Sequence, residues 1–90
     1  MKITELERFN RANEFSHEHA DDPRGQKELC LEYLKQYGSV TPLEALSAFN
    51  SLRLSSLIFR LRNEGHDIDT LLNEDGKKFA IYILKGEEDE

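Results

Sequence analysis

Residues 41–65 read TPLEALSAFNSLRLSSLIFRLRNEG and carry two helix patterns separated by a short polar break. Thr41, Pro42 and Glu44 form a helix-start signature. A threonine N-cap and a glutamate three residues later bond each other's backbone amides, and proline suits the first helical position. The signature predicts a helix of about two turns over residues 42–49.

The second helix pattern of this stretch lies between residues 53 and 64. Apolar residues recur there at i, i+3, i+4 and i+7, which is the spacing of one buried helical stripe. Gly65 then provides a stop signal. The residues predicted to point inward are Leu54, Leu57, Ile58 and Leu61.

An earlier apolar stripe predicts a further helix over residues 24–37. Pro23 and Gly38 stand at its two ends, where they favour helix entry and exit. Cys30 lies on the stripe, so we interpret it as a core residue and not as a nucleophile. It is the single cysteine of the chain, which excludes an internal disulfide and a zinc site built from cysteines. The stripe consists of Leu29, Cys30, Tyr33, Leu34 and Tyr37.

After Gly65 the apolar period changes from 3.6 residues to 2 residues. Residues 66–72 and 78–84 are rich in the residue types that form strands. Between them, Asp75 and Gly76 form a dipeptide that is a strong hairpin signal. The pattern predicts an antiparallel two-stranded hairpin that closes the domain.

The N-terminal 23 residues leave two alternatives open. Residues 1–15 have an apolar stripe, and Thr4 and Glu7 stand in the capping-box relation, which together predict a short helix. Residues 16–23 are polar and end in proline, which indicates a linker. The segment is therefore either a partly ordered arm or a helix docked on the domain. The stripe consists of Leu6, Phe9, Ala12 and Phe15.

We divide the chain into an N-terminal arm and linker (1–23), a folded domain (24–85) and an acidic disordered tail (86–90). The net charge of −6 is concentrated at the ends. Residues 1–23 hold three basic and six acidic side chains, and Glu87–Glu90 are all acidic, whereas residues 24–86 hold nine basic and eight acidic side chains. The net charge therefore does not exclude a nucleic-acid partner.

The run TPLEALSAFNSLRLSSLIFRLRNEGHDIDT, followed after a short turn by GKKFAIYIL, resembles the winged helix-turn-helix family of small bacteriophage and prophage proteins. The shared pattern is a T-x-x-E-A-L helix, a tight turn, an R-L-x-x-x-I-x-x-L-R helix, G-x-x-I and an aromatic-rich strand. It spans residues 27–84, although Leu57 stands where a polar or basic residue is usual. The resemblance implies an α+β fold with a three-helix core and a C-terminal β-hairpin wing, preceded here by a partly ordered helical arm. It also implies binding to duplex DNA, as a regulator or accessory factor of a mobile element.

In that fold, the helix over residues 53–64 lies in the major groove and its outward side chains contact bases and phosphates. Lysines at the hairpin tip would contact an adjacent phosphate run. Arg62 has a second interpretation, as a tie from the helix to Asp67 or Asp69. The candidate DNA-binding residues are Arg53, Ser55, Ser56, Arg60, Arg62, Asn63, Lys77 and Lys78.

Phe59 lies about 100° from Ile58 around the same helix, off the main apolar stripe. Two alternatives follow for its ring. It either packs against Tyr82 or Leu71 of the hairpin, or it is exposed and suits a protein partner better than DNA.

No residue pattern indicates catalysis or a bound cofactor. The chain has no Ser-His-Asp order, no glycine-rich phosphate loop and no paired carboxylates in an apolar setting. His17 and His19 are spaced as a cation-binding pair, but no third and fourth ligand follows at a fixed spacing. We therefore expect neither an enzyme nor a metal site.

The apolar residues also bear on location. The longest apolar stretch, Phe79–Leu84, is six residues and too short to span a membrane as a helix. Residues 1–8 have no apolar leader region, so we expect no secretory precursor. These observations and the single cysteine favour a reducing cytoplasm, and the family resemblance implies that of a bacterial host cell.

Two functions fit the sequence. The first is a phage or prophage DNA-binding regulator or accessory protein, with the stripe of the N-terminal arm available for a homodimer. The second is a protein-binding module whose acidic flanks imitate phosphates and which inhibits a host or phage protein that handles nucleic acids. The basic residues of 53–64 and of the hairpin tip favour the first function, and the acidic ends favour the second.

Overall fold

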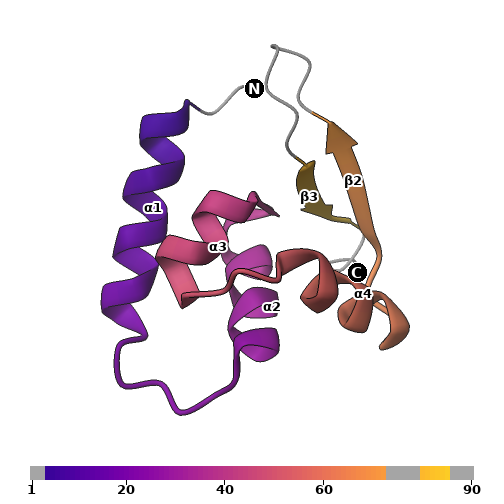
Figure 1. The fold of residues 1–90 in the computed structure, drawn as a ribbon, viewed down its shortest axis with the longest axis horizontal. Coiled ribbons are helices and arrows are strands. Elements are labelled where there is room, and N and C mark those ends of the chain that lie inside the picture. The colour runs from indigo at the N-terminus through magenta and orange to yellow at the C-terminus, as the bar shows by residue number, and fades with distance from the viewer. Residues whose placement is uncertain (1–3, 73–79, 86–90) are drawn as a thin grey trace.

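The computed structural model describes residues 4–72 and 80–85. Within these ranges the helices and strands form an α+β fold (Figure 1). The order of elements is α1 (Glu5–Glu18), α2 (Gln26–Tyr37), β1 (Ser39–Val40), α3 (Pro42–Phe49), α4 (Leu54–Asn63), β2 (Ile68–Leu72) and β3 (Ala80–Leu84).

Helix α1 and strand β2 lie on opposite sides of the molecule. In Figure 1, α1 forms one edge of the molecule, β2 and α4 lie on the opposite side, and α2 and α3 lie between them. Helix α1 packs along α3, and α2 packs against α4. This arrangement leaves α4 and the sheet together on the side away from α1.

The sheet has three strands in the order β1-β3-β2, and both pairings are antiparallel. Val40 of β1 pairs with Tyr82 of β3, and Thr70 of β2 pairs with the same Tyr82 from the other side. The predicted hairpin is present, but the prediction of two strands was incomplete. Strand β1 is only two residues long, too short for an alternating pattern to reveal it. The Asp75-Gly76 turn lies outside the described residues.

One core joins all four described helices. Phe15 of α1 is completely buried and meets Tyr33 of α2 edge-on, with ring centroids 5.0 Å apart. It also meets Phe49 of α3, at 6.3 Å. Of the two alternatives left open for the N-terminal segment, the structure has the docked helix. Only half of its apolar stripe is used for docking, because Ala12 and Phe15 are buried whereas Leu6 and Phe9 are exposed.

Helix ends follow their local signals closely. Both predicted capping boxes are present, Thr4 with Glu7 and Thr41 with Glu44. Gly38 ends α2 in the left-handed region, at φ 89°, where a side chain would be strained. The predicted linker over 16–23 was wrong at its start, since α1 continues to Glu18, and polar residues alone do not end a helix.

Cys30 occupies the core, as its place on the stripe predicted. Its side chain is fully buried between the helices. Burial raises the pKa of the Cys30 thiol to about 12, because a thiolate would lose its hydration. The thiol is therefore neutral at physiological pH, as expected for a small core residue.

Candidate nucleic-acid interface

The turn between α3 and α4 fixes where the second helix begins. Asn50 adopts the left-handed conformation at φ 56°, and the amide of Ser51 then donates to the Ala45 carbonyl oxygen at 3.2 Å. The buried Ser51 hydroxyl accepts a hydrogen bond from the backbone amide of Arg53, the N-cap of α4, at 3.2 Å. These bonds satisfy backbone groups at both helix ends and hold α4 at a defined angle to α3.

Helix α4 separates its side chains cleanly into two faces. The inward residues Leu54, Leu57, Ile58 and Leu61 are each at most 7% exposed, so Leu57 is a core residue. Within α4 there is no acidic side chain. The outward side is polar and basic apart from one phenylalanine. The exposed residues are Arg53, Ser55, Ser56, Phe59, Arg60, Arg62 and Asn63.

Two of the arginines lie on one flank of this outward face. Arg53, Ser56 and Arg60 are three and seven residues apart, so they share one side of the helix. Among the residues that the structure describes, no hydrogen bond or ion pair engages the guanidinium of Arg53 or Arg60. Both charges are therefore available to a partner.

Arg62 is used differently, as a tie to the hairpin. Its Nε donates to the Ile68 carbonyl oxygen at 2.8 Å, and its Nη2 donates to the Thr70 hydroxyl at 2.7 Å. The predicted tie to Asp67 or Asp69 was correct in direction but wrong in its partners. The Asp69 carboxylate instead binds Lys85 at 3.1 Å. Arg62 thus sets the angle between α4 and β2.

The ring of Phe59 is 64% exposed. The alternative that it is buried against the hairpin was therefore wrong, and the contact from α4 to β2 is made by Arg62, three residues further on. Leu71, one of its two expected neighbours, is itself 55% exposed. The candidate lysines of the hairpin tip, Lys77 and Lys78, lie outside the described residues.

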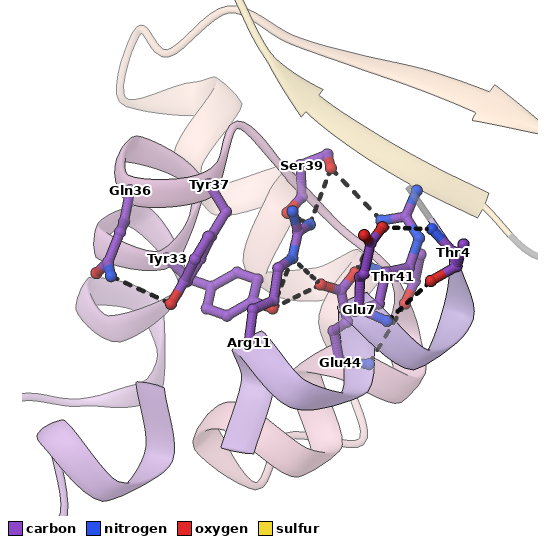
Figure 2. A network of polar contacts seen from close by, with 10 residues as sticks. Thr4, Glu7, Arg11, Tyr33, Gln36, Tyr37, Ser39, Thr41 and Glu44 are labelled. Atoms are coloured by element: carbon purple, nitrogen blue, oxygen red, sulfur yellow. Dashed lines mark hydrogen bonds and ion pairs between the residues drawn. The ribbon is translucent and has the colours of Figure 1, made fainter. Parts of the chain in front are cut away.

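A second pair of arginines lies on the far side of the molecule and was missed by sequence reasoning. Arg8 and Arg11 of α1 both reach Glu44 of α3. Figure 2 shows Arg11 beside Glu44 and Tyr33. Arg8 Nη1 lies 3.1 Å from Oε1 and Arg11 Nε lies 2.7 Å from Oε2 of this carboxylate, whose side chain is 2% exposed. Tyr33 Oη donates a third hydrogen bond to Oε2 at 2.5 Å. We call Arg8, Arg11, Tyr33 and Glu44 the Glu44 cluster.

The Glu44 cluster is satisfied on every side. Arg11 Nη2 also donates to the Ser39 carbonyl oxygen at 2.8 Å, and its guanidinium lies over the Tyr37 ring, 4.9 Å from the centroid. Burial and the bond to the Glu44 carboxylate raise the pKa of the Tyr33 phenol above its usual value. The cluster therefore joins α1 to α3 and β1, and both of its guanidinium groups are engaged within the fold.

Beside the cluster, α1 and α3 enclose an open groove of about 350 Å³. The protruding Leu43 of α3 is 76% exposed, and Phe9 and Leu6 of α1 are 54% and 68% exposed. The groove is thus a mainly apolar surface, separate from the outward face of α4. Its lining is Arg8, Phe9, Thr41, Pro42, Leu43, Glu44 and Ser47.

His17 in the last turn of α1 and His19 at its C-cap have different environments. The His19 ring stacks on Phe15 at 3.9 Å between centroids, and its Nδ1 lies 3.0 Å from the Phe15 carbonyl oxygen. His17 is exposed. In the described ranges no three His, Cys, Asp or Glu side chains gather as a metal site would require. None of the helices in these ranges has the length and apolar character needed to cross a membrane.

Comparison with known families gives one match. A family model described as a winged helix-turn-helix domain matches residues 25–85, from just before α2 through the end of β3. The matched range contains α4 and the sheet, and α1 precedes it. No curated protein and no solved structure matches the chain.

Proposed function

Because the chain belongs to the winged helix-turn-helix domain family, we propose that it binds duplex DNA with α4 in the major groove and the β2–β3 hairpin against the neighbouring backbone. The outward face of α4 carries the argument. It presents Arg53 and Arg60 without a partner among the described residues, and α4 has no acidic residue to repel phosphates.

Each candidate residue has a proposed role. Arg53, Ser55 and Ser56 lie at the start of α4, where side chains of a recognition helix contact base edges. Arg60 lies further along the same flank and contacts a base or a phosphate. Arg62 keeps its bonds to β2 and orients the wing. Asn63 extends the polar face at its end, and Lys77 and Lys78 remain predicted phosphate contacts.

The biological role is a proposal that rests on the sequence resemblance. We propose a regulator or accessory protein of a phage or prophage that acts in the cytoplasm of its bacterial host. Winged helix-turn-helix domains are typically DNA-binding folds without enzymatic activity, so the proposal includes no catalysis. This role predicts a preferred duplex site and not merely a general affinity for DNA.

A salt-titrated binding isotherm tests the DNA proposal. The logarithm of the affinity for a fluorescent duplex should fall linearly with the logarithm of salt concentration, with a slope of about −0.9 per neutralised phosphate. Arg53→Ala with Arg60→Ala should weaken binding, whereas Arg24→Ala, which removes an exposed arginine outside α4, should not. Arg60→Lys distinguishes a phosphate contact from a base contact at this position, because lysine retains a phosphate contact but loses bidentate base recognition. No duplex binding near about 50 mM salt would refute the proposal.

A second copy of the chain is the proposed partner of the α1–α3 groove. Phe9 and Leu43 line the groove and are exposed, as is Leu6 one turn before Phe9, and the nearby Arg8 is ion-paired with Glu44. A two-fold interface needs such self-complementarity, and dimers of this class read paired half-sites. Light scattering should give a dimer mass that Phe9→Glu reduces to a monomer. Phe59→Glu, the same change at an exposed phenylalanine of α4, should leave the mass unchanged.

The alternative function is a protein-binding module. It is supported by the exposed Glu14 and Glu18 of α1, whose carboxylates can imitate phosphates, and by the apolar groove beside that helix. This function predicts that Glu14→Gln with Glu18→Gln abolishes capture of a nucleic-acid-handling protein, while Arg53→Ala with Arg60→Ala does not. The reverse result would favour DNA as the partner.

A further inference from the structure

Phe59 is the one large apolar side chain on the outward face of α4. It lies three residues after Ser56 and four before Asn63, so these polar residues are its neighbours along the helix surface. The inward stripe of Leu54 and Leu61 lies on the opposite side. The ring is 64% exposed and stands on an otherwise polar and basic helix face.

The surroundings of Phe59 indicate the chemistry of its partner. The flank formed by Arg53 and Arg60 is positively charged and unpaired among the described residues, and no carboxylate occurs within α4. A partner that covers this face must therefore be anionic and must also offer an apolar group near its centre. The major groove of duplex DNA has both properties, because phosphates line its edges and the C5 methyl of thymine projects into it.

We infer that Phe59 is a specificity-determining residue that packs its ring against the methyl group of a thymine in the major groove. The inference rests on the proposed function, since it requires α4 to enter the groove. The inference explains why the exposed Phe59 lies among arginines. It also requires that the preferred DNA site contain at least one thymine. Burial of one methyl group corresponds to a roughly four-fold gain in affinity.

Replacement of thymine by deoxyuridine tests the inference, because it removes the methyl group and leaves every hydrogen bond of the base pair in place. Duplexes selected from a random library by the full chain provide the preferred site. Each thymine of this site is then replaced singly, and affinities are measured by fluorescence anisotropy. The wild type should lose roughly four-fold in affinity at one or two positions. Phe59→Ala should bind the thymine and uracil duplexes equally.

Arg60→Ala is the matched control. This variant should bind DNA more weakly overall yet retain the discrimination between thymine and uracil, because the Phe59 ring is unchanged. A wild type that is indifferent to every replacement, or a Phe59→Ala variant that still discriminates, would overturn the inference while leaving the proposed function intact. Unchanged DNA affinity in Phe59→Ala would also overturn it and indicate a protein partner for the ring. Absence of any duplex binding would refute both the inference and the proposed function.

Discussion

Two pairs of arginines on opposite sides of the molecule have opposite environments. Arg8 and Arg11 of α1 bind the buried Glu44, and their side chains are 15% and 12% exposed. Arg53 and Arg60 border the outward face of α4, where both are exposed and have no partner among the described residues. The same residue type thus stabilises the fold at one end and is available for recognition at the other.

This difference has a single structural cause, which is the position of Glu44. One carboxylate in the first turn of α3 caps its own helix and accepts bonds from two arginines of α1. Among the described residues, no carboxylate forms an ion pair with Arg53 or Arg60. Changes at the Glu44 cluster should therefore alter stability, and changes at Arg53 and Arg60 should alter binding alone.

Glu44→Ala should produce the largest loss of stability. It leaves two largely buried guanidinium groups without their carboxylate and removes the capping box, so the free energy of unfolding should fall by about 3–5 kcal/mol. Urea denaturation measures this loss, with the exposed Glu14→Ala as control. Glu44→Gln should lose less, because its amide oxygen can still cap the helix. A loss below about 1 kcal/mol for Glu44→Ala would show that the cluster does not hold α1 to α3.

Arg11→Ala and Arg60→Ala form the direct comparison between the two regions. Arg11→Ala removes bonds to Glu44, Tyr33 and Ser39 and should cost about 1.5–3 kcal/mol. Arg60→Ala removes an unpaired surface charge and should change stability by less than about 0.5 kcal/mol. Urea denaturation of both variants measures these losses. Equal losses of unfolding free energy would contradict the distinction between the Glu44 cluster and the outward face of α4.

The Tyr33 phenol should make stability depend on alkaline pH. Its pKa is raised in the folded chain, so the unfolded chain loses this proton first, near the usual pKa of about 10. The contribution is complete below about pH 10 and declines above it, by at most about 1.4 kcal/mol per pH unit. Denaturation midpoints from pH 8 to 11 measure the decline. It should be smaller in Tyr33→Phe, where the raised pKa of Tyr37 still contributes, and should persist undiminished in Tyr82→Phe. An undiminished decline in Tyr33→Phe would assign it elsewhere.

The two capping boxes should contribute unequally to the free energy of unfolding, and both contributions should be small. Thr41→Ala removes a buried cap beside the Glu44 cluster and should cost about 1 kcal/mol. Thr4→Ala removes the same kind of cap at the exposed start of α1 and should cost less, because fraying there exposes little of the core. A larger loss for Thr4→Ala would indicate that α1 is held by its first turn and not by the cluster.

The sequence predicted what depends on neighbouring residues. The capping boxes, the left-handed Gly38 and the inward stripe of α4 all arise within a few positions, and each is present in the structure. The exposure of Arg53 and Arg60 also follows from helical phase. Helical phase predicts their exposure but not what they bind, so their binding to DNA stays a prediction.

What the sequence did not predict depends on residues far apart in the chain. Glu44 is 36 positions from Arg8 and 33 from Arg11, and such distant pairs leave no periodic pattern. Strand β1 arises from two residues that pair with β3 across the molecule. Arg62 likewise bonds the Ile68 carbonyl, a backbone group that is present whatever side chain the sequence places there.

The central claim is that DNA contacts α4 and not the α1 side of the molecule. An amide chemical-shift titration of the full chain with its selected duplex tests this directly, because it reports both regions in one experiment. The account predicts large shifts for residues 53–63 and for Thr70 and Leu71 of the wing, with little change along Glu5–Glu18. Shifts confined to α1 and the groove, with none on α4, would contradict it.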